Sequence, residues 1–578
     1  MANLRPVLLI GLLVLGGMLW VEWQKDYGPQ FGAQQAAPEA PAATGSATVS
    51  ADGLPSVPGG ASDLPPPDAA PVVPGDEAAS QTADGMSASR PASGTSPSPV
   101  VTVRTDVLAM EIDLVGGSVV SAQLLNYPVT LEQPENKVQL LRRAGPHLFI
   151  AQSGLLSERP APNHTTTYQA EQREYVLADG ADELRIPLSW TSGDGIRVTR
   201  TFVLRRGAYE LAVHDQVENQ SATPWTGSRY DQLQRSITDE DTERTYTNPG
   251  TYSFTGIAFY SPEDKFEKVA FDDVADDPFN KTFSGGWLSM IQHYFFAAWI
   301  PPADVTVAYS TQEIAPDGWP RYLARAVAPA QTIQPGARGE FVSRLYLGPK
   351  LQEELEEVAP GLEHTVNYGI FTVFSKPLFW LLSHIHALVG NWGWAIVLLT
   401  VLIKAAFFKL TEAQYRSMAR MRKLQPRIEQ LKERYGDDRQ RMSQAMMELY
   451  KKEKVNPLGG CLPILVQIPI FIALYWVLLE SVELRQAPFV GWIQNLSVRD
   501  PYFILPALNA GFMIATQRLT PMAGMDPLQR KMMNLMPVVF AVMFAFFPAG
   551  LVLYWATNAG LSLAQQLYIT RKIAAADN

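Results

Sequence analysis

The residue with the clearest chemical potential is a lysine inside a long apolar run. Lys404 lies in Leu398-Leu-Thr-Val-Leu-Ile-Lys404-Ala-Ala-Phe-Phe408, and a cation near the centre of a bilayer costs roughly 2.5–3.5 kcal/mol on insertion scales. Such a cost usually marks a function. The alternative is that Lys404, like Lys409, extends its side chain along the helix to the cytoplasmic surface. A buried cation in a groove open to water would attract acidic or polar polypeptide segments without catalysis.

Other polar side chains occur in the neighbouring apolar runs. Thr400 lies one helical turn before Lys404 on the same face. Each polar residue alone is explained by an ordinary hydrogen bond between helices, so the hypothesis of a polar groove depends on the set. No Asp or Glu lies in these runs, which disfavours a proton relay and leaves Lys404 without a counter-ion there. The further polar residues are Gln467, Asn509, Thr516, Asn558, Gln565 and Gln566.

Long apolar runs are the elements that would position these residues. The last two runs are joined by Phe547-Pro-Ala-Gly550, which predicts a tight helical hairpin. The fourth run has about 15 apolar residues, hence roughly 22 Å of helix against a hydrocarbon core of about 30 Å, so lipid would thin around it. We therefore predict five membrane spans, at about 389–408, 461–479, 502–517, 533–547 and 549–569.

A sixth apolar segment lies at the N-terminus. Pro6 to Val21 follow Arg5, as in a signal peptide or a membrane anchor. Aromatic residues after this run are typical of a retained helix, so residues 1–24 are predicted to be an uncleaved anchor. Residues 25–100 are rich in Ala, Pro, Gly and Ser, which predicts a disordered linker outside the cytoplasm.

Residues 101–350 have a different pattern, with short runs that alternate apolar and polar residues. Met110, Ile112 and Leu114 are one example. The length and the regular turn signals predict a large all-β domain built as a sandwich of antiparallel strands.

An apolar stripe follows the β-rich region. Its residues recur at steps of three and four among glutamates, which predicts an amphipathic helix over 351–370. The helix could pack on the β domain or lie on the membrane surface, and the spans that begin immediately afterwards favour the second. The stripe consists of Leu351, Leu355, Val358, Leu362 and Val366.

The basic residues concentrate between the first two of the five spans. Residues 411–455 are predicted to form a cytoplasmic hairpin of two helices joined at 436–438, because basic loops stay inside. Both termini, including the short tail 571–578, are then cytoplasmic. Its methionines suit varied apolar partners and its basic face suits ribosomal RNA or acidic lipid, although hairpin packing and plain solvation are the alternatives. The candidate contact residues are Met418, Met421, Arg422, Lys423, Arg427 and Met446.

Composition narrows the classes of function further. The formal net charge of −10 gives no reason to expect DNA as a partner. The single cysteine, Cys461, excludes an intrachain disulfide, a redox pair and a cysteine-based zinc cluster, and we expect no metal site.

Several strings carry a resemblance to a known family. They include Met421-Arg-Lys-Leu-Gln-Pro426, Asn456-Pro-Leu-Gly-Gly-Cys461, Leu484-Arg-Gln-Ala-Pro-Phe489, Phe547-Pro-Ala-Gly-Leu-Val-Leu-Tyr-Trp555 and Gln292-His-Tyr-Phe295. With these strings the chain closely resembles the YidC insertases of Gram-negative bacteria. The resemblance implies a six-span protein of the inner membrane with a five-helix insertase core and polar groove. It also implies a periplasmic supersandwich domain, similar to sugar-epimerase domains.

The resemblance also implies a function and a site. The family inserts and folds nascent membrane proteins in the phospholipid bilayer, alone or beside the Sec translocon, with the ribosome as a further partner and no cofactor. Its groove cation corresponds to Lys404 and neighbouring groove positions to Thr400 and Gln467, with Tyr554 and Trp555 near the substrate path. Many relatives have Arg where this chain has Lys404, which puts in doubt any bidentate guanidinium contact. The short tail weakens the case for tail-mediated ribosome docking.

Two other functions remain open at this stage. The β domain could be a sugar-processing enzyme with His214 or His293 as acid and base, although a lone histidine in a strand is more often structural. The membrane part could be a solute transporter with Lys404 as its anion site. An insertase and chaperone without a covalent reaction is the preferred interpretation.

Overall fold

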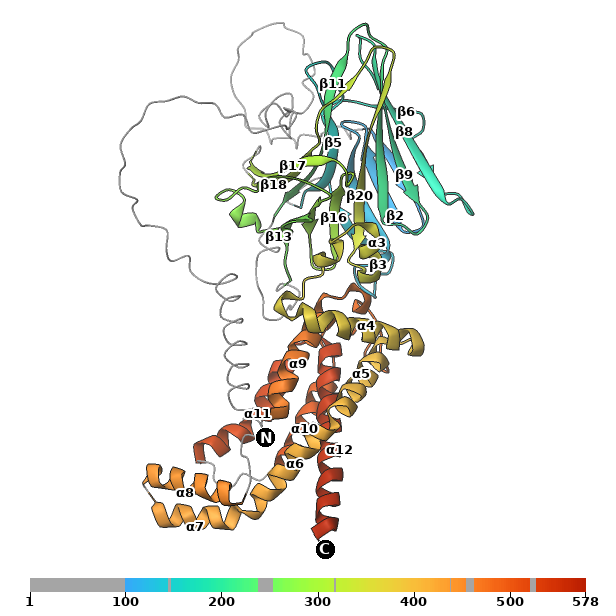
Figure 1. The fold of residues 1–578 in the computed structure, drawn as a ribbon. Helices are drawn as coiled ribbons and strands as arrows, with labels where there is room; N and C mark the ends of the chain where they lie inside the picture. The colour runs from blue at the N-terminus through green and yellow to red at the C-terminus, as the bar shows by residue number, and fades with distance from the viewer. Residues whose placement is uncertain are drawn as a thin grey trace, which may run out of the picture.

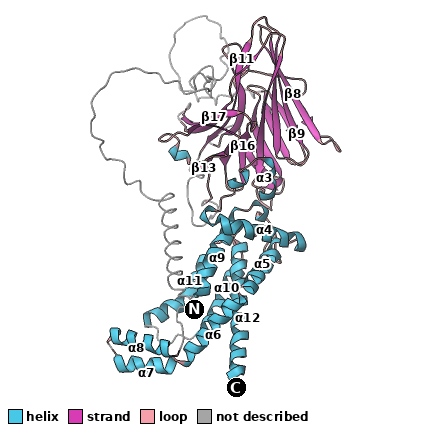
Figure 2. Ribbon diagram, viewed as in Figure 1, coloured by secondary structure: helices cyan, strands magenta, loops and turns pink. Residues whose placement is uncertain are grey.

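The computed structural model describes residues 99–143, 147–237, 253–315, 319–436, 438–453, 462–519 and 527–577 (Figure 1). The expected anchor 1–24 and nearly all of the expected linker 25–100 lie outside the described residues. Strands occupy the first half of the described chain and helices the second (Figure 2). The prediction of a large β domain followed by a helical region is confirmed.

The first of the two sheets of the β domain has 11 strands. Neighbouring strands are antiparallel except for the parallel pair β1 and β7. Along its path the strands are β14 (Asn280–Ser284), β17 (Thr306–Ile314), β18 (Arg321–Val327), β11 (Trp225–Ser236), β5 (Phe149–Leu156), β3 (Ser118–Pro128), β2 (Leu108–Asp113), β1 (Val100–Arg104) and β7 (Glu174–Val176), with β19 (Gln331–Ile333) beside β11 and β4 (Lys137–Leu141) beside β3.

The second sheet has nine strands, all antiparallel to their neighbours. Its central strands are the longest, as expected for a sheet that is buried in the middle and short at the edges. Along its path the strands are β13 (Lys265–Val269), β12 (Gly256–Ser261), β15 (Trp287–Ile291), β16 (Phe295–Ile300), β20 (Arg338–Pro349), β10 (Glu210–Asn219), β9 (Ile196–Arg205), β8 (Glu183–Thr191) and β6 (Gln169–Ala170).

The sheets face each other across a core that contains a buried charged cluster. The predicted alternation is present, since Met110 and Ile112 are buried core residues. Asp215 on β10 receives hydrogen bonds from Arg200 on β9 at 2.7 and 3.0 Å and from Arg229 on the other sheet at 2.6 Å. Burial alone would raise the pKa of Asp215, but the two guanidinium groups outweigh it and hold that pKa below its ordinary value. The cluster therefore ties the two sheets together.

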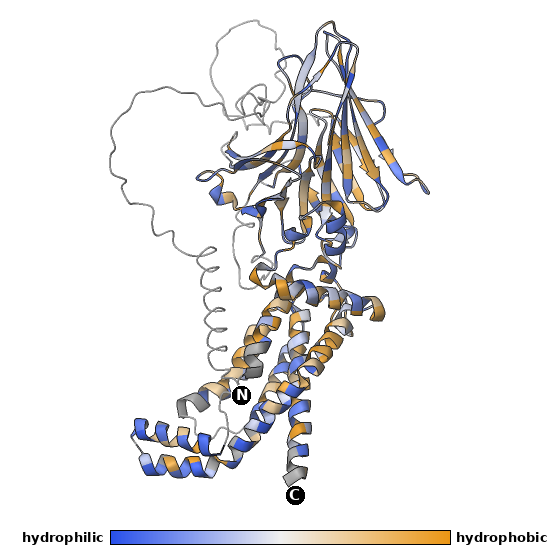
Figure 3. Ribbon diagram, in the orientation of Figure 1, coloured by the Kyte–Doolittle hydropathy of each residue, from blue (hydrophilic) through white to orange (hydrophobic). Residues whose placement is uncertain are grey.

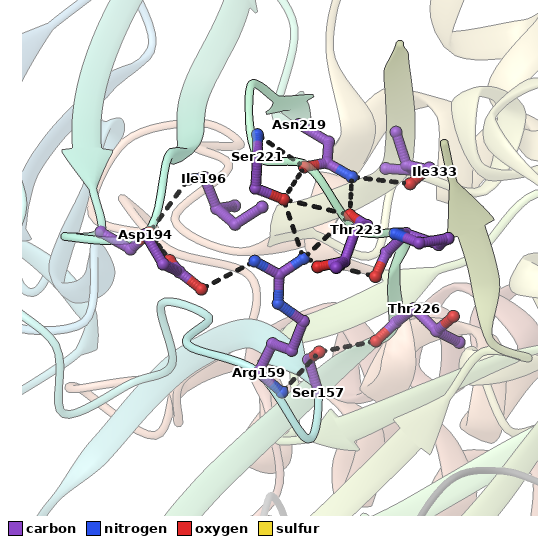
Figure 4. A network of polar contacts seen from close by, with 11 residues as sticks. Ser157, Arg159, Asp194, Ile196, Asn219, Ser221, Thr223, Thr226 and Ile333 are labelled. Carbon is purple, nitrogen blue, oxygen red and sulfur yellow. Dashed lines mark hydrogen bonds and ion pairs between the residues drawn. The ribbon is translucent and has the colours of Figure 1, made fainter. Parts of the chain in front are cut away.

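A second polar network joins loops at strand ends (Figure 4). Arg159, just after β5, donates to Asp194 Oδ2 at 2.8 Å and to Ser221 Oγ at 3.0 Å. Asn219 Nδ2 donates to the carbonyl oxygens of Thr223 and Ile333 at 2.8 and 2.9 Å. These bonds tie the turn after β10 to the loop after β5 and to β19, which identifies the network as a structural tie.

The continuous amphipathic helix expected over 351–370 is not present. The segment forms α3 (Gln352–Val358) and the short 3-10 helices η4 (Leu362–Thr365) and η5 (Gly369–Phe371). Pro360 lacks an amide hydrogen, and Gly361 has a φ of 78°, so the helix ends before them. Leu355 and Leu362 are fully buried in the core, which corresponds to the alternative of packing against the protein.

The helical region contains nine α-helices in the described chain after α3. One of them, α4, has no counterpart among the predicted elements, although its apolar side chains are spaced for an amphipathic helix. In Figure 1 it lies at the junction with the β domain. The helices are α4 (Thr372–Val389), α5 (Trp392–Ala406), α6 (Phe408–Lys423), α7 (Gln425–Tyr435), α8 (Arg439–Lys452), α9 (Leu462–Glu480), α10 (Ile504–Leu519), α11 (Pro527–Phe544) and α12 (Ala549–Asp577).

The helices α5, α9, α10, α11 and α12 overlap the five apolar runs, and α5 and α9 are mostly apolar in Figure 3. No single described helix is both long and apolar enough to span a membrane, whereas α5 and the start of α6, bent by 61° at one break, satisfy that test as a pair. The last two helices are less tightly paired than expected. Trp555 of α12 contacts Phe544 of α11 at 4.9 Å between ring centroids, but α11 packs mainly on α10. Helix α12 also continues through the expected tail, to Asp577.

The predicted two-helix hairpin consists of three helical segments. The chain breaks between α6 and α7 at Leu424, because Pro426 in the first turn of α7 cannot continue the hydrogen bonding of α6. The turn at 436–438 does join two antiparallel helices, α7 and α8. Asp438 caps α8 by accepting a hydrogen bond from the backbone N–H of Arg441 at 3.0 Å. The hairpin is largely polar in Figure 3, unlike α5 and α9.

Candidate functional site

A cavity of about 550 Å³ lies between five helices of the helical region. Its walls come from α5, α9, α10, α11 and α12, so residues far apart in the sequence meet there. Among the described residues no carboxylate lines it. The lining residues are Lys404, Gln467, Ile468, Phe471, Asn509, Met513, Thr516, Gln517, Met533, Met536, Pro537, Trp555, Asn558, Ala559 and Ser562.

Lys404 is held in this cavity by helix α12. It lies in the last turn of α5, where the helix dipole favours a cation. Its Nζ donates a hydrogen bond to Ser562 Oγ at 2.8 Å, and Ser562 Oγ donates to the carbonyl oxygen of Asn558 at 2.7 Å. Tyr415 on α6 donates to the carbonyl oxygen of Ser562 at 3.3 Å. The ammonium group is therefore only partly buried and has a neutral partner.

Sequence reasoning did not identify Ser562. Its only signal is its place four residues after Asn558, which puts both on one face of a helix. A serine so spaced in an apolar run is too common to be singled out. Its role is visible only once α5 and α12 are packed together.

Thr400 does not reach the cavity. It is buried, with 1% of its surface exposed, and its Oγ1 donates to the carbonyl oxygen of Ile396 on its own helix at 2.7 Å. This is the local bond that serine and threonine commonly form within helices. Lys404 is thus the one predicted site residue of α5 that lines the cavity.

The aromatic candidates form one cluster on the cavity wall. Trp555 lines the cavity and meets Phe471 of α9 edge to face, with 4.2 Å between ring centroids. Tyr554 is fully buried behind this wall and stacks on Phe471 at 6.1 Å, so it supports the cavity instead of lining it. Gln467, one turn before Phe471, lines the cavity as predicted.

Polar and adaptable groups share the rest of the wall. Asn509 Oδ1 and Trp555 Nε1 are buried and have no hydrogen-bond partner among the described residues. Buried polar atoms normally pair, so these two are unusual in lying unpaired beneath the wall, while the polar side chains of Gln467 and Asn558 line the cavity. Met513, Met533 and Met536 supply flexible, polarisable apolar surface beside them. The cavity can therefore accept polar and apolar groups together.

The hairpin candidates have different surroundings. Met446 packs with Leu424 and Ile428 inside the hairpin, as the packing alternative expected. Arg427 is exposed and pairs with Glu453 at 2.5 Å, and Lys423 is also exposed. The side chains of Met418, Met421 and Arg422 lie outside the described set. Of the described candidates, the exposed basic side chains are the ones available to a partner.

The two histidines of the sugar-enzyme hypothesis are not part of one site. His214 on β10 pairs with Glu340 at 2.9 Å on the exposed surface of the sheet. His293, between β15 and β16, bonds through Nε2 to the carbonyl oxygen of Leu479 at 2.9 Å. Burial lowers the pKa of His293 to about 3. A neutral histidine engaged with a helix end has a structural role, so this geometry gives the hypothesis no acid and base pair.

Comparisons with known proteins cover the whole described chain. A family model described as the YidC periplasmic domain matches residues 100–381, and one described as 60Kd inner membrane protein matches residues 384–576. A protein of Thioalkalivibrio sulfidiphilus named membrane protein insertase YidC is 48% identical over 581 residues, which cover 99% of each chain. One of the same name from Methylococcus capsulatus is 47% identical over 574 residues, again 99% of each chain.

Similarity to solved structures is weaker. A crystal structure described as an active YidC insertase with its first transmembrane domain resolved is 18% identical, has a TM-score of 0.37 and covers 81% of this chain and 92% of its own. A galactose mutarotase related enzyme from Lactobacillus acidophilus is 10% identical, with a TM-score of 0.29 over 43% of this chain and 97% of its own. TM-scores this low carry no argument about activity.

Proposed function

Because the chain belongs to the YidC family of membrane protein insertases, which are inner-membrane proteins with a periplasmic domain, we propose that it inserts and folds nascent inner-membrane proteins through the cavity around Lys404. It acts alone or together with the Sec translocon, as insertase and chaperone, without a covalent reaction. The N-terminal anchor and the five apolar helical segments form six spans in this proposal, with both termini in the cytoplasm.

The observation that carries the proposal is a cation in a cavity that no described carboxylate lines. Lys404 is partnered by the neutral Ser562, so its charge is not cancelled there. In a medium of low dielectric constant such a charge attracts an acidic or polar segment more strongly than it would in water. The attraction lowers the energy of moving a hydrophilic segment part of the way across the bilayer.

The other walls of the cavity suit a polypeptide whose polar and apolar segments pass through it in turn. The side-chain amides of Gln467 and Asn558, which line the cavity, offer acceptors and donors to a polar backbone. The three methionines can adjust to apolar side chains of different shape. A transient contact of this kind requires no tight binding and no cofactor.

The proposal also assigns partners to the polar hairpin. The exposed Lys423 and Arg427 are suited to contact ribosomal RNA or anionic lipid at the cytoplasmic surface. The Arg427–Glu453 pair reduces the charge that Arg427 offers. Contact with the Sec translocon rests on family membership and not on a particular surface of this chain.

Reconstitution tests the function directly. Purified protein in liposomes is expected to accelerate insertion of a membrane protein with one or two spans, measured by protease protection of its translocated segment. Photocrosslinking from positions 404, 467 and 555 to a ribosome-stalled nascent chain should locate the substrate in the cavity, whereas position 185 on the β domain surface should not crosslink. Equal insertion into empty and protein-containing vesicles would exclude the function.

A further inference from the structure

A short segment at the end of α9 collects most of the polar contacts between the helical region and the β domain. The carbonyl oxygen of Leu479 accepts a hydrogen bond from His293 Nε2 at 2.9 Å, and Arg485 Nη2 donates to the carbonyl oxygen of Pro128 at 2.8 Å. Gln352 donates through its backbone N–H to Glu483 and through its side chain to Ser481, both at 3.3 Å. Three separate parts of the β domain and its connection therefore converge on residues 479–486.

A buried ion pair lies at the centre of this junction. Lys350, directly after β20, and Glu480, the last residue of α9, approach to 4.0 Å, and each side chain is 1% exposed. Ser253 donates to the same carboxylate at 3.0 Å. Burial lowers the pKa of Lys350 to about 8 against the opposing effect of Glu480. Removing either partner would leave an uncompensated buried charge, which would destabilise the packing of the β domain against the end of α9.

The helix that carries Glu480 also forms a wall of the cavity. Gln467, Ile468 and Phe471 of α9 line the cavity, and Phe471 lies nine residues before Glu480, roughly 14 Å along a helix axis. Pro469 lies inside α9 among these wall residues. A proline removes one hydrogen bond of the helix and permits a bend at that point. The position of the wall therefore depends on what fixes the far end of α9.

We propose that the β domain is a positioning element of the insertase, which fixes the cavity wall formed by α9 through the buried Lys350–Glu480 contact. This inference rests on the proposed function and assigns the β domain a part in it. Lys350 and Glu480 are positioning residues, since neither lines the cavity. Helix α12 forms an adjoining wall, where Trp555 meets Phe471 of α9. In the described part of the chain α12 has no ion pair with the β domain, so loosening the junction should disturb α9 and leave α12 in place.

The test uses the full chain in nanodiscs or liposomes with Cys461 replaced by Ser. Glu480→Gln keeps the acceptor for Ser253 but leaves the buried ammonium group of Lys350 without an opposite charge. Lys350→Met leaves the buried carboxylate of Glu480 without one, and the double variant removes both charges. Two spin labels, one at the exposed position 304 of the β domain and one at the exposed position 388 of α4, give the distribution of distances between the β domain and the helical region. Photocrosslinkers at 468 on α9 and 559 on α12 report each wall separately. Lys281→Ala, which removes an exposed ion pair elsewhere in the β domain, is the control.

Each single variant should broaden the distance distribution and lower both insertion and the crosslinks from 468 at least threefold, with the crosslinks from 559 unchanged. The double variant should return all of these to within twofold of the parent, and Lys281→Ala should match the parent. The inference is overturned if the distance distribution of the single variants stays as narrow as that of the parent. It is also overturned if the distribution broadens while insertion and the crosslinks from 468 persist, or if the crosslinks from 468 and 559 fall together. If the parent itself does not accelerate insertion, the proposed function fails instead.

Discussion

Lys404 Nζ lies 2.8 Å from Ser562 Oγ, a contact that joins α5 to α12 across 158 residues of sequence. The partner of the buried cation is thus a hydroxyl group and not a carboxylate. A hydroxyl fixes the position of the ammonium group without neutralising it. In the proposed function this arrangement keeps the charge available to a passing substrate, and it distinguishes the site from an ion pair such as Lys350–Glu480.

The charge at position 404 should matter more than the shape of its head group. Lys404→Arg is expected to retain insertion within about twofold, while Lys404→Glu should lower it by about tenfold or more for substrates with acidic translocated segments, because attraction becomes repulsion. Protease protection in liposomes measures both. Lys409→Glu, at an exposed position on α6, is the matched control. Normal insertion by Lys404→Glu would remove the electrostatic basis of the proposal.

Ser562 should contribute by holding the ammonium group in the cavity. Ser562→Ala removes the acceptor, and a hydrogen bond to a charged group contributes about 1.5–3 kcal/mol. We expect insertion and crosslinking from position 404 to fall about three- to tenfold. Ser562→Thr keeps a hydroxyl group and should stay close to the parent. An alanine variant with full crosslinking would show that Lys404 needs no anchor.

Glu483 should make the stability of the junction depend on pH. Burial, with Glu353 and Glu354 adding to it, raises the pKa of Glu483 to about 7. A raised carboxyl pKa stabilises the folded state fully below the unfolded value of about 4.5, and this stabilisation is lost as pH rises towards 7. The loss is about 3 kcal/mol at most.

Glu483→Gln should remove that dependence. Its thermal midpoint should match the parent near pH 5 and exceed it at pH 8, measured by tryptophan fluorescence of the full chain in detergent. Glu313→Gln, at an exposed position, should follow the parent at both values. Parallel curves for the parent and Glu483→Gln would show that Glu483 is charged in the folded protein throughout.

The buried charged cluster of the β domain should be essential for its stability. Asp215 and Arg200 are both fully buried. Asp215→Ala leaves the Arg200 guanidinium group uncompensated, while Arg229 keeps its ion pair with Asp231 at 2.8 Å, and it should destabilise the domain by about 3–5 kcal/mol. Urea unfolding of the full chain, followed by tryptophan fluorescence, measures this. Arg185→Ala, which breaks an exposed pair on β8, should have no measurable effect. A small change for Asp215→Ala would mean that water reaches the cluster.

Local patterns explain what could be predicted of the fold. Alternation in the segment around Met110 and Ile112 and the long apolar runs are properties of neighbouring residues, so they mark strands and helices directly. The prediction of one helix over 351–370 was wrong. Its apolar spacing continues across Pro360 and Gly361, but the backbone properties of these two residues end a helix. The break at Leu424 before Pro426 was missed for the same reason.

The candidate site was predictable only in part. A charge in an apolar run identifies Lys404 without any knowledge of its surroundings, because the energy of burying it is a property of the run. By its spacing Thr400 lies on the same helical face as Lys404, yet its hydroxyl donates to the carbonyl oxygen of Ile396 and does not reach the cavity. Side-chain hydrogen bonds of this kind depend on rotamers and on neighbouring helices, which spacing does not specify.

The sequence by itself determined the division into a β domain and a helical region, the position of the buried cation and the membership of an insertase family. Only the tertiary structure decided that Ser562 partners Lys404 and that Lys350 meets Glu480. The sequence places Lys350 at the end of the β domain and Glu480 directly after a predicted span. Periodicity and the length of apolar runs describe only residues that are close together in the sequence. Contacts between residues more than a hundred positions apart depend on how whole elements pack, and no local pattern encodes that.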